Sequence, residues 1–219
     1  MDGGIVHSGD QDATNARIAE CAQTGKDELN LASLRLEIFP GDVFGVTFVR
    51  TLNLRGNALE YLPKTMDLLS SLEILNLSEN KLRALPDSLG SCASLRKLQL
   101  QHNKLTQLPD SIGQLSNLRE LYIGNNRLTS LCDGIVDLVQ LESIDARHNA
   151  IERMPEGLNT KSLPNLHIVN FQHNPIQELP WSIQCLQDMF PVLTNAEERR
   201  RLVKRSLRTR KKVAERLLV

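Results

Sequence analysis

Three histidines recur at one position of a repeated pattern, and their type and spacing could support chemistry. His102, His148 and His173 each stand directly before an asparagine of that pattern. If the repeats stack, His148 and His173 lie about 5 Å apart, the spacing of adjacent strands. Two imidazoles at this distance could bind a metal ion or respond to pH. The same position in other repeats holds serine, glycine, glutamate or asparagine, so we favour the alternative, an ordinary polar surface.

Other signatures of catalysis are missing from the sequence. We find no glycine-rich phosphate loop, no paired spacing of metal ligands and no nucleophile motif. The cysteines, Cys21, Cys92, Cys132 and Cys185, are scattered singly, which favours free thiols in a reducing compartment. Cys92 and Cys132 are expected in return segments as small fillers or inert thiols. We therefore predict a non-enzymatic protein with no catalytic residue, no metal site and no cofactor.

The repeat that contains the histidines has a period of 23 residues. Its pattern is Leu-x-Leu-x-x-Asn-x-Leu-x-x-Leu-Pro, in which Leu-x-Leu alternates as a half-buried strand does. The asparagine can turn the chain by bonding nearby backbone groups, and the Leu-Pro step starts a return segment. One coil cannot bury its own apolar face, so the copies must stack as a solenoid. Copies begin at Leu29 (degenerate), Leu52, Leu75, Leu98, Leu121, Ile144 and, after a longer interval, Val169.

The pattern resembles the leucine-rich-repeat family over roughly residues 26–190. The resemblance implies an α/β fold: a right-handed solenoid with a parallel concave sheet and short helical or irregular segments on its other side. We expect residues 26–190 to form one elongated domain of seven repeats. An open solenoid exposes apolar edges at its ends, so a helical N-terminal cap and a C-terminal basic helix should flank it.

The N-terminal segment is predicted as a cap. Residues 1–11 are expected to be disordered, and residues 12–25 to form a capping helix that starts at Asp12 or Thr14 and ends before Gly25. Its apolar face would be Ile18, Cys21 and Ala22. The stretch 16–25 resembles the opening of small intracellular leucine-rich-repeat proteins of the class related to Ras suppressors and Ras-interacting proteins. That resemblance implies a small GTPase or another signalling protein as the partner.

The C-terminal segment, residues 191–219, is predicted as a cap followed by a basic amphipathic helix. Residues 197–219 hold ten basic and three acidic residues, a net charge of +7, whereas the whole chain is neutral. The helix could pack its leucines on the last coil, or dock on an acidic partner or an anionic membrane. It could also target the nucleus or contact nucleic acid. The residues expected to make such contacts are Arg201, Lys204, Arg205, Arg208, Lys211 and Lys212.

The concave face is predicted as the principal binding surface. Its non-leucine strand positions hold six basic and seven acidic residues, which does not suit a nucleic-acid backbone. Tyrosine and arginine often anchor protein interfaces, although a merely solvated face would explain any single one of them. The residues expected to bind a partner are Arg96, Arg119, Tyr122 and Arg147, followed by Arg50 and Glu73.

We therefore predict a monomeric scaffold or adaptor that is involved in signalling and binds a partner protein on its concave sheet. The alternative is a membrane-surface or nucleic-acid-associated protein that binds through its basic helix. No stretch approaches the roughly 18 apolar residues of a membrane span, and the first residues lack the features of a secretory signal. We expect a cytoplasmic protein, with the nucleus as a second location.

Overall fold

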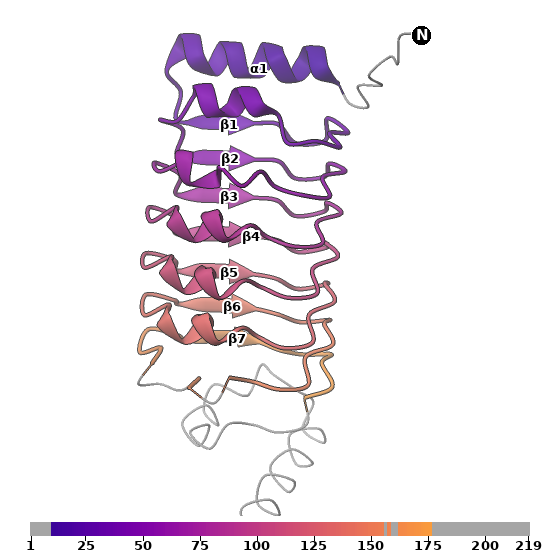
Figure 1. The fold of residues 1–219 in the computed structure, drawn as a ribbon, viewed down its shortest axis with the longest axis vertical. Helices are drawn as coiled ribbons and strands as arrows, with labels where there is room; N and C mark the ends of the chain where they lie inside the picture. The colour runs from indigo at the N-terminus through magenta and orange to yellow at the C-terminus, as the bar shows by residue number, and fades with distance from the viewer. Residues whose placement is uncertain (1–9, 156, 159–161, 177–219) are drawn as a thin grey trace, which may run out of the picture.

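The computed structural model describes residues 10–155, 157–158 and 162–176, which form a stack of similar coils (Figure 1). Each coil contributes one short strand to a parallel sheet of seven strands, ordered as they follow along the chain. The predicted leucine-rich-repeat fold with its parallel sheet is therefore confirmed. The strands are β1 (Glu28–Asn30), β2 (Thr51–Asn53), β3 (Ile74–Asn76), β4 (Lys97–Gln99), β5 (Glu120–Tyr122), β6 (Ser143–Asp145) and β7 (Ile168–Asn170).

The register of the sheet follows the sequence repeat. Leu52 of β2 pairs with Leu75 of β3, and Leu75 pairs with Leu98 of β4. Equivalent side chains therefore lie one above the other along the stack. The longer last interval is absorbed outside the sheet, since Ile144 still pairs with Val169.

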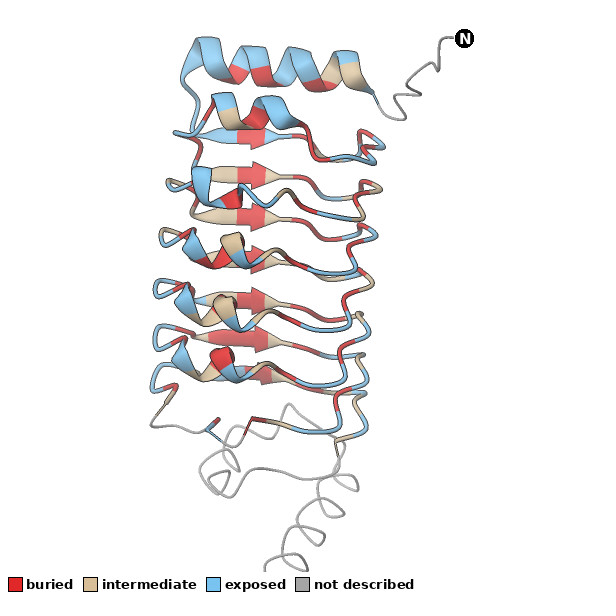
Figure 2. Cartoon of the chain, viewed as in Figure 1, coloured by how far each residue is buried: buried red, intermediate tan, exposed pale blue. Residues whose placement is uncertain are grey.

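The core is one continuous column of leucines between the sheet and the return segments. Figure 2 shows the pattern on the strands, where the central residue is buried and, except for Ser143 of β6, its neighbours are more exposed. Leu52, Leu75, Leu98 and Leu121 have no exposed surface. The burial is shared between neighbouring coils, because each strand places its apolar side chain against those above and below.

A ladder of asparagines ties each coil to the next: Asn57, Asn80, Asn103, Asn126, Asn149 and Asn174. Asn103 is 8% exposed, and its side-chain oxygen accepts from the amide of Leu82 at 2.9 Å. Its nitrogen donates to the carbonyl oxygens of Leu77 and Leu100, at 2.9 and 3.0 Å. Leu77 and Leu82 belong to the preceding coil, so one side chain satisfies backbone groups of two coils. The asparagine was predicted to bond nearby backbone groups and turn its own coil. In the structure it also bonds the preceding coil.

The return segments are short 3-10 helices: η1 (Gly41–Gly45), η2 (Met66–Leu68), η3 (Asp87–Ser91), η4 (Asp110–Gln114) and η5 (Asp133–Asp137). Pro86 and Pro109 precede η3 and η4 in extended conformation, and Cys132 replaces proline before η5 with similar angles. A Cβ added to Gly113 of η4 would come within 2.4 Å of the Gly134 carbonyl oxygen. Neighbouring 3-10 helices therefore pack backbone against backbone.

The helical N-terminal cap is confirmed, with corrections to its details. Helix α1 (Gln11–Thr24) lies across the first coil (Figure 1) and begins one residue earlier than predicted. Its N-cap is Asp10 rather than Asp12 or Thr14, because the Asp10 carboxylate accepts from the amide of Ala13 at 3.1 Å. Thr14, Ile18 and Cys21 form the buried face, whereas Ala22 is exposed. Gly25 ends the helix in the left-handed conformation, at φ 66°.

Several predictions fall outside the described residues. They are the disordered state of residues 1–9, the end of the predicted repeat domain over 177–190, the C-terminal cap and basic helix over 191–219, the six basic contact residues of that helix, and Cys185. Asp10 and Gln11 were also predicted to be disordered, but they cap and begin α1. Within the part of the chain that the structure describes, no helix is both long and apolar enough to cross a bilayer.

Candidate protein-binding face

The outer side chains of the strands, with those of the residues before and after each strand, form a polar surface that we call the sheet face. It corresponds to the predicted concave face. In β2 to β5 the first and third strand residues are only partly buried, because the central leucine takes the core position. The sequence repeat thus sets which side chains a partner could contact.

Three residues in the middle of this face form what we call the central cluster: Lys97, Glu120 and Tyr122. Lys97 pairs with Glu120 on the next strand, with 2.8 Å between Nζ and Oε2. The Tyr122 hydroxyl donates to the same Oε2 at 2.7 Å. The Lys97 ammonium also lies 5.3 Å from the centre of the Tyr122 ring, within cation–π range. These contacts hold the Tyr122 ring in place and give its hydroxyl group a hydrogen-bond partner.

The cluster shifts the protonation equilibria of its members. The hydrogen bond from Lys97 lowers the pKa of Glu120, against the effect of its partial burial. The pKa of Lys97 is raised, chiefly by the same bond. Burial, followed by the bond to Glu120, raises the pKa of Tyr122. All three groups therefore keep their usual charge states near neutral pH.

The residues that precede the strands form a line of charges along the stack. Glu73 lies between Arg50 and Arg96, with oxygen–nitrogen distances of 2.9 and 3.7 Å. Arg119 pairs with Glu142 at 2.9 Å. Arg96 and Arg119 are consecutive in this line, so two like charges lie beside each other in its middle. The predicted residues Arg50, Glu73, Arg96 and Arg119 are thus brought together by the register.

The remaining basic residues of the sheet face are paired as well. Arg55 contacts Glu79 at 2.8 Å, and this bond lowers the pKa of Glu79. The predicted residue Arg147 contacts Asp145 on its own coil at 3.3 Å. Each of the six basic residues therefore has a carboxylate within ion-pair distance, and a ligand would meet a surface of compensated charges.

Lys97 and Glu120 were part of the predicted face but not among the predicted anchor residues. Residue type alone, which favours tyrosine and arginine as anchors, does not select either of them. Their spacing of 23 residues, combined with the period of the repeat, was the signal that would have paired them in adjacent strands.

The histidine column has a backbone explanation. His102, His148 and His173 all adopt left-handed φ angles of 53–59°, as do Glu79 and Asn125 at equivalent positions. Among non-glycine residues, histidine and asparagine enter this region more readily than most. What the residues at this position share is therefore the left-handed backbone conformation of the turn that follows each strand.

The predicted closeness of His148 and His173 is observed, but the geometry does not suit a shared metal ion. Their rings stack with centroids 4.1 Å apart and planes inclined by 11°. A metal ion lies in the plane of each imidazole that binds it, and two nearly parallel planes have no common position between the rings. In the described ranges, no group of three or more histidine, cysteine or acidic residues could hold a metal ion.

The cysteines that the structure describes are free thiols. Cys92 and Cys132 lie at the ends of return segments, as predicted. Burial raises the pKa of each thiol to about 11, which leaves little thiolate near neutral pH.

Comparisons with known proteins agree with this architecture. The model of the leucine rich repeat family matches residues 47–105 and 93–151. The solved leucine-rich repeat domain of the type III effector XopL is 28% identical, with a TM-score of 0.70 over 77% of this chain and 60% of that chain. This chain thus spans less than two thirds of that structure's length.

A leucine-rich-repeat protein of Leptospira interrogans is 21% identical over 76% of this chain and 59% of that one, with a TM-score of 0.36. No curated protein matches the chain. Leucine-rich-repeat proteins generally mediate contacts between proteins, and the fold is typically a non-enzymatic scaffold. By its repeats, its sheet, the match to the family model and the likeness to the XopL domain, this chain carries leucine-rich repeats and has the leucine-rich-repeat fold.

Proposed function

We propose that this protein is a non-enzymatic adaptor that binds another protein on its sheet face, with the central cluster in the middle of the interface. The observation that supports this most is the arrangement of Tyr122. Its ring is held by Lys97 and Glu120, its hydroxyl is already bonded, and part of its surface is exposed. A fixed aromatic side chain loses little conformational entropy on binding, which favours it as an anchor.

The charges around the cluster favour a protein over a polyanion. Arg96 and Arg119 precede the two strands of the cluster, yet each already contacts a carboxylate. A partner with its own mixture of charged and polar groups can exchange bonds with such a surface. A signalling partner, such as a small GTPase, is the identity suggested by the resemblance of residues 16–25 to small Ras-related repeat proteins.

The test is quantitative co-purification from the native cell type with four forms of the full chain. The first is unchanged, and the second replaces Arg96, Arg119 and Tyr122 with alanine. The third is a control that likewise removes one tyrosine and two positive charges, from exposed positions outside the sheet face: Tyr61→Ala, Lys64→Ala and Arg153→Ala. The fourth ends after Asn195 and lacks the basic segment.

We expect the sheet-face variant to lose partners that the control and the truncated chain retain. If only the truncated chain loses them, the basic segment mediates binding, which is the alternative function at a membrane surface or nucleic acid. If the sheet-face variant retains every partner, binding through the sheet face is excluded.

A further inference from the structure

A second surface differs from the sheet face because its positive charges have no partners. Where the coils turn away from the sheet, the residue after the ladder asparagine is basic in three consecutive coils: Lys81, Lys104 and Arg127. We call these residues the basic stripe. Among the described residues none of them makes a side-chain hydrogen bond or ion pair. The basic residues of the sheet face, in contrast, all contact carboxylates.

The backbone holds the basic stripe in a regular line. The amide of Lys104 donates to the carbonyl of Leu82, the residue after Lys81, at 2.8 Å. The amide of Arg127 donates in the same way to Leu105 at 2.9 Å. Each stripe residue also follows an asparagine of the ladder, so its backbone is tied to the neighbouring coil. The backbone positions of the three residues are therefore repeated at about 4.8 Å, the spacing of adjacent strands.

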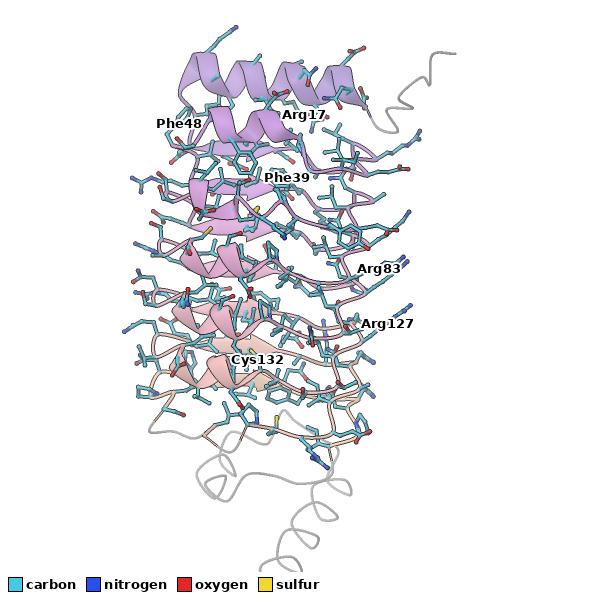
Figure 3. All side chains as sticks on the ribbon, in the orientation of Figure 1. Arg17, Phe39, Phe48, Arg83, Arg127 and Cys132 are labelled. Atoms are coloured by element: carbon cyan, nitrogen blue, oxygen red, sulfur yellow. The ribbon has the colours of Figure 1, made fainter. Side chains whose placement is uncertain are left out.

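The stripe lies on an outer edge of the stack and is accessible. Lys81 and Arg127 are exposed and Lys104 is partly exposed. Figure 3 shows Arg127 and the nearby Arg83 on the same edge, with both side chains directed away from the ribbon. Arg83 contacts Glu60 at 3.4 Å, so a fourth positive charge near the stripe is partly compensated.

The spacing of the stripe matches one kind of acidic ligand. In an α-helix, residues i, i+3 and i+7 lie on one face and advance by about 4.5 and 10.5 Å. The stripe advances by about 4.8 and 9.6 Å over its three residues. In an extended peptide, side chains on one side repeat at about 6.7 Å, so the mismatch grows with each step.

We propose that the basic stripe binds an acidic helical segment of a partner protein, with carboxylates at i, i+3 and i+7 facing Arg127, Lys104 and Lys81 in either direction. A nucleic-acid strand fits less well. Three free basic residues provide a small positive field, and carboxylates lie nearby, that of Glu79 in the coil of Lys81 and that of Glu60 in the coil before it. The proposal concerns a surface other than the sheet face and does not depend on the function proposed for that face.

The test uses the full chain and two helical alanine- and glutamine-rich peptides of about 18 residues, long enough to form helix. Both contain the same three glutamates. In one peptide they stand at i, i+3 and i+7; in the other they are five residues apart and point in different directions. The C-terminal basic segment is present in every measurement, and the equal composition of the peptides cancels its general attraction for acidic ligands.

Three forms of the chain are compared by fluorescence anisotropy at low salt. The stripe variant carries Lys81→Ala, Lys104→Ala and Arg127→Ala. The control, with the same change in net charge, carries Arg17→Ala, Lys64→Ala and Arg153→Ala. We expect the unchanged chain and the control to bind the one-faced peptide about fivefold more tightly than the other peptide, and the stripe variant to lose this preference.

Equal binding of the two peptides to the unchanged chain would overturn the proposal. A preference that survives in the stripe variant would do the same, because the selectivity would then arise elsewhere. A short oligothymidylate is measured in parallel. If its binding depends on the stripe while the peptides are not distinguished, the stripe binds nucleic acid instead.

Discussion

The asparagine ladder allows a quantitative prediction. Two of its members are equally buried, but replacing them leaves different numbers of backbone groups without a hydrogen bond. Asn57 and Asn103 are both 8% exposed. In Asn103→Ala the amide of Leu82 loses its acceptor. The carbonyls of Leu77 and Leu100 lose one donor each but keep another, from Asn80 and Asn126.

Most of the backbone groups that bond to Asn57 have no second partner, because Asn57 lies at the start of the ladder. Its oxygen accepts from the amides of both Leu34 and Leu36, each at 3.0 Å. Its nitrogen donates to the Leu31 carbonyl at 2.9 Å, and no second donor to that oxygen exists among the described residues. Only the Leu54 carbonyl keeps another bond, from Asn80. Asn57→Ala therefore leaves three backbone groups unbonded, whereas Asn103→Ala leaves one.

A buried polar group without a partner costs about 1–3 kcal/mol, and a lost bond whose acceptor keeps a second donor costs about 0.5–1 kcal/mol. We expect the free energy of unfolding to fall by about 3 kcal/mol in Asn103→Ala and by about 2–3 kcal/mol more in Asn57→Ala. Urea denaturation followed by circular dichroism measures both. Asn117→Ala is the control, because exposed Asn117 donates one bond, to Ala93, and should cost less than about 1 kcal/mol.

The reasoning fails if Asn57→Ala costs no more than Asn103→Ala. That result would mean that water or a shift of the first coil satisfies the exposed groups, and that burial in the folded chain does not determine the cost.

Three further predictions follow from packing and protonation. Gly113→Ala should lower the free energy of unfolding by about 1–3 kcal/mol, because its methyl group would meet a carbonyl of the next coil. Gly45→Ala is the control and should not lower it, because nothing lies within 4 Å of the added carbon. Urea denaturation of the two variants compares them. With a pKa of about 11, Cys132 should react with iodoacetamide at pH 8 about 100-fold more slowly than a thiol of ordinary pKa; peptide mass spectrometry measures this, and an ordinary rate would contradict the burial. Because the folded-state pKa of Glu120 is lowered, its contribution to stability is complete above its ordinary pKa and is lost as the pH falls through the lowered value. In Lys97→Met, an NMR titration should find the pKa of Glu120 higher, and an unchanged value would show that Lys97 is not the main cause.

Much of the fold could be predicted from the sequence because the repeat applies one rule at every coil. Leu-x-Leu specifies a strand with one buried side chain, and stacking converts the sequence period into a sheet register. The predicted position of the return segments follows from proline before η3 and η4. The N-cap of α1 was predicted wrongly, as Asp12 or Thr14, because the side chains of Asp10, Asp12 and Thr14 can all cap a helix. Tertiary contacts select among them, since the amide of Asp10 bonds to the Leu34 carbonyl at 2.9 Å.

The candidate site was only partly predictable, because its properties belong to pairs of residues. Tyr122 was selected as an anchor by type, but its fixed position depends on Glu120 and Lys97. The left-handed turn before each ladder asparagine was not predicted at all. Its occupants share no size or charge, and His102 and Glu79 are alike only in their backbone angles.

The same register that explains the paired charges of the sheet face also explains the free charges of the basic stripe. At the position before each strand of the sheet face, most neighbouring coils carry opposite charges, as Arg50, Glu73 and Arg96 do, so stacking places opposite charges together. In the stripe, successive coils carry the same sign, and stacking places Lys104 next to Lys81 without a carboxylate between them. Such a line of like charges is held together by the backbone ladder against its own repulsion, at some cost in stability. An external anion would relieve that repulsion, whereas an anion at the sheet face would have to displace a carboxylate already present. The two surfaces therefore differ in the ligands they favour, although one sequence period generates both.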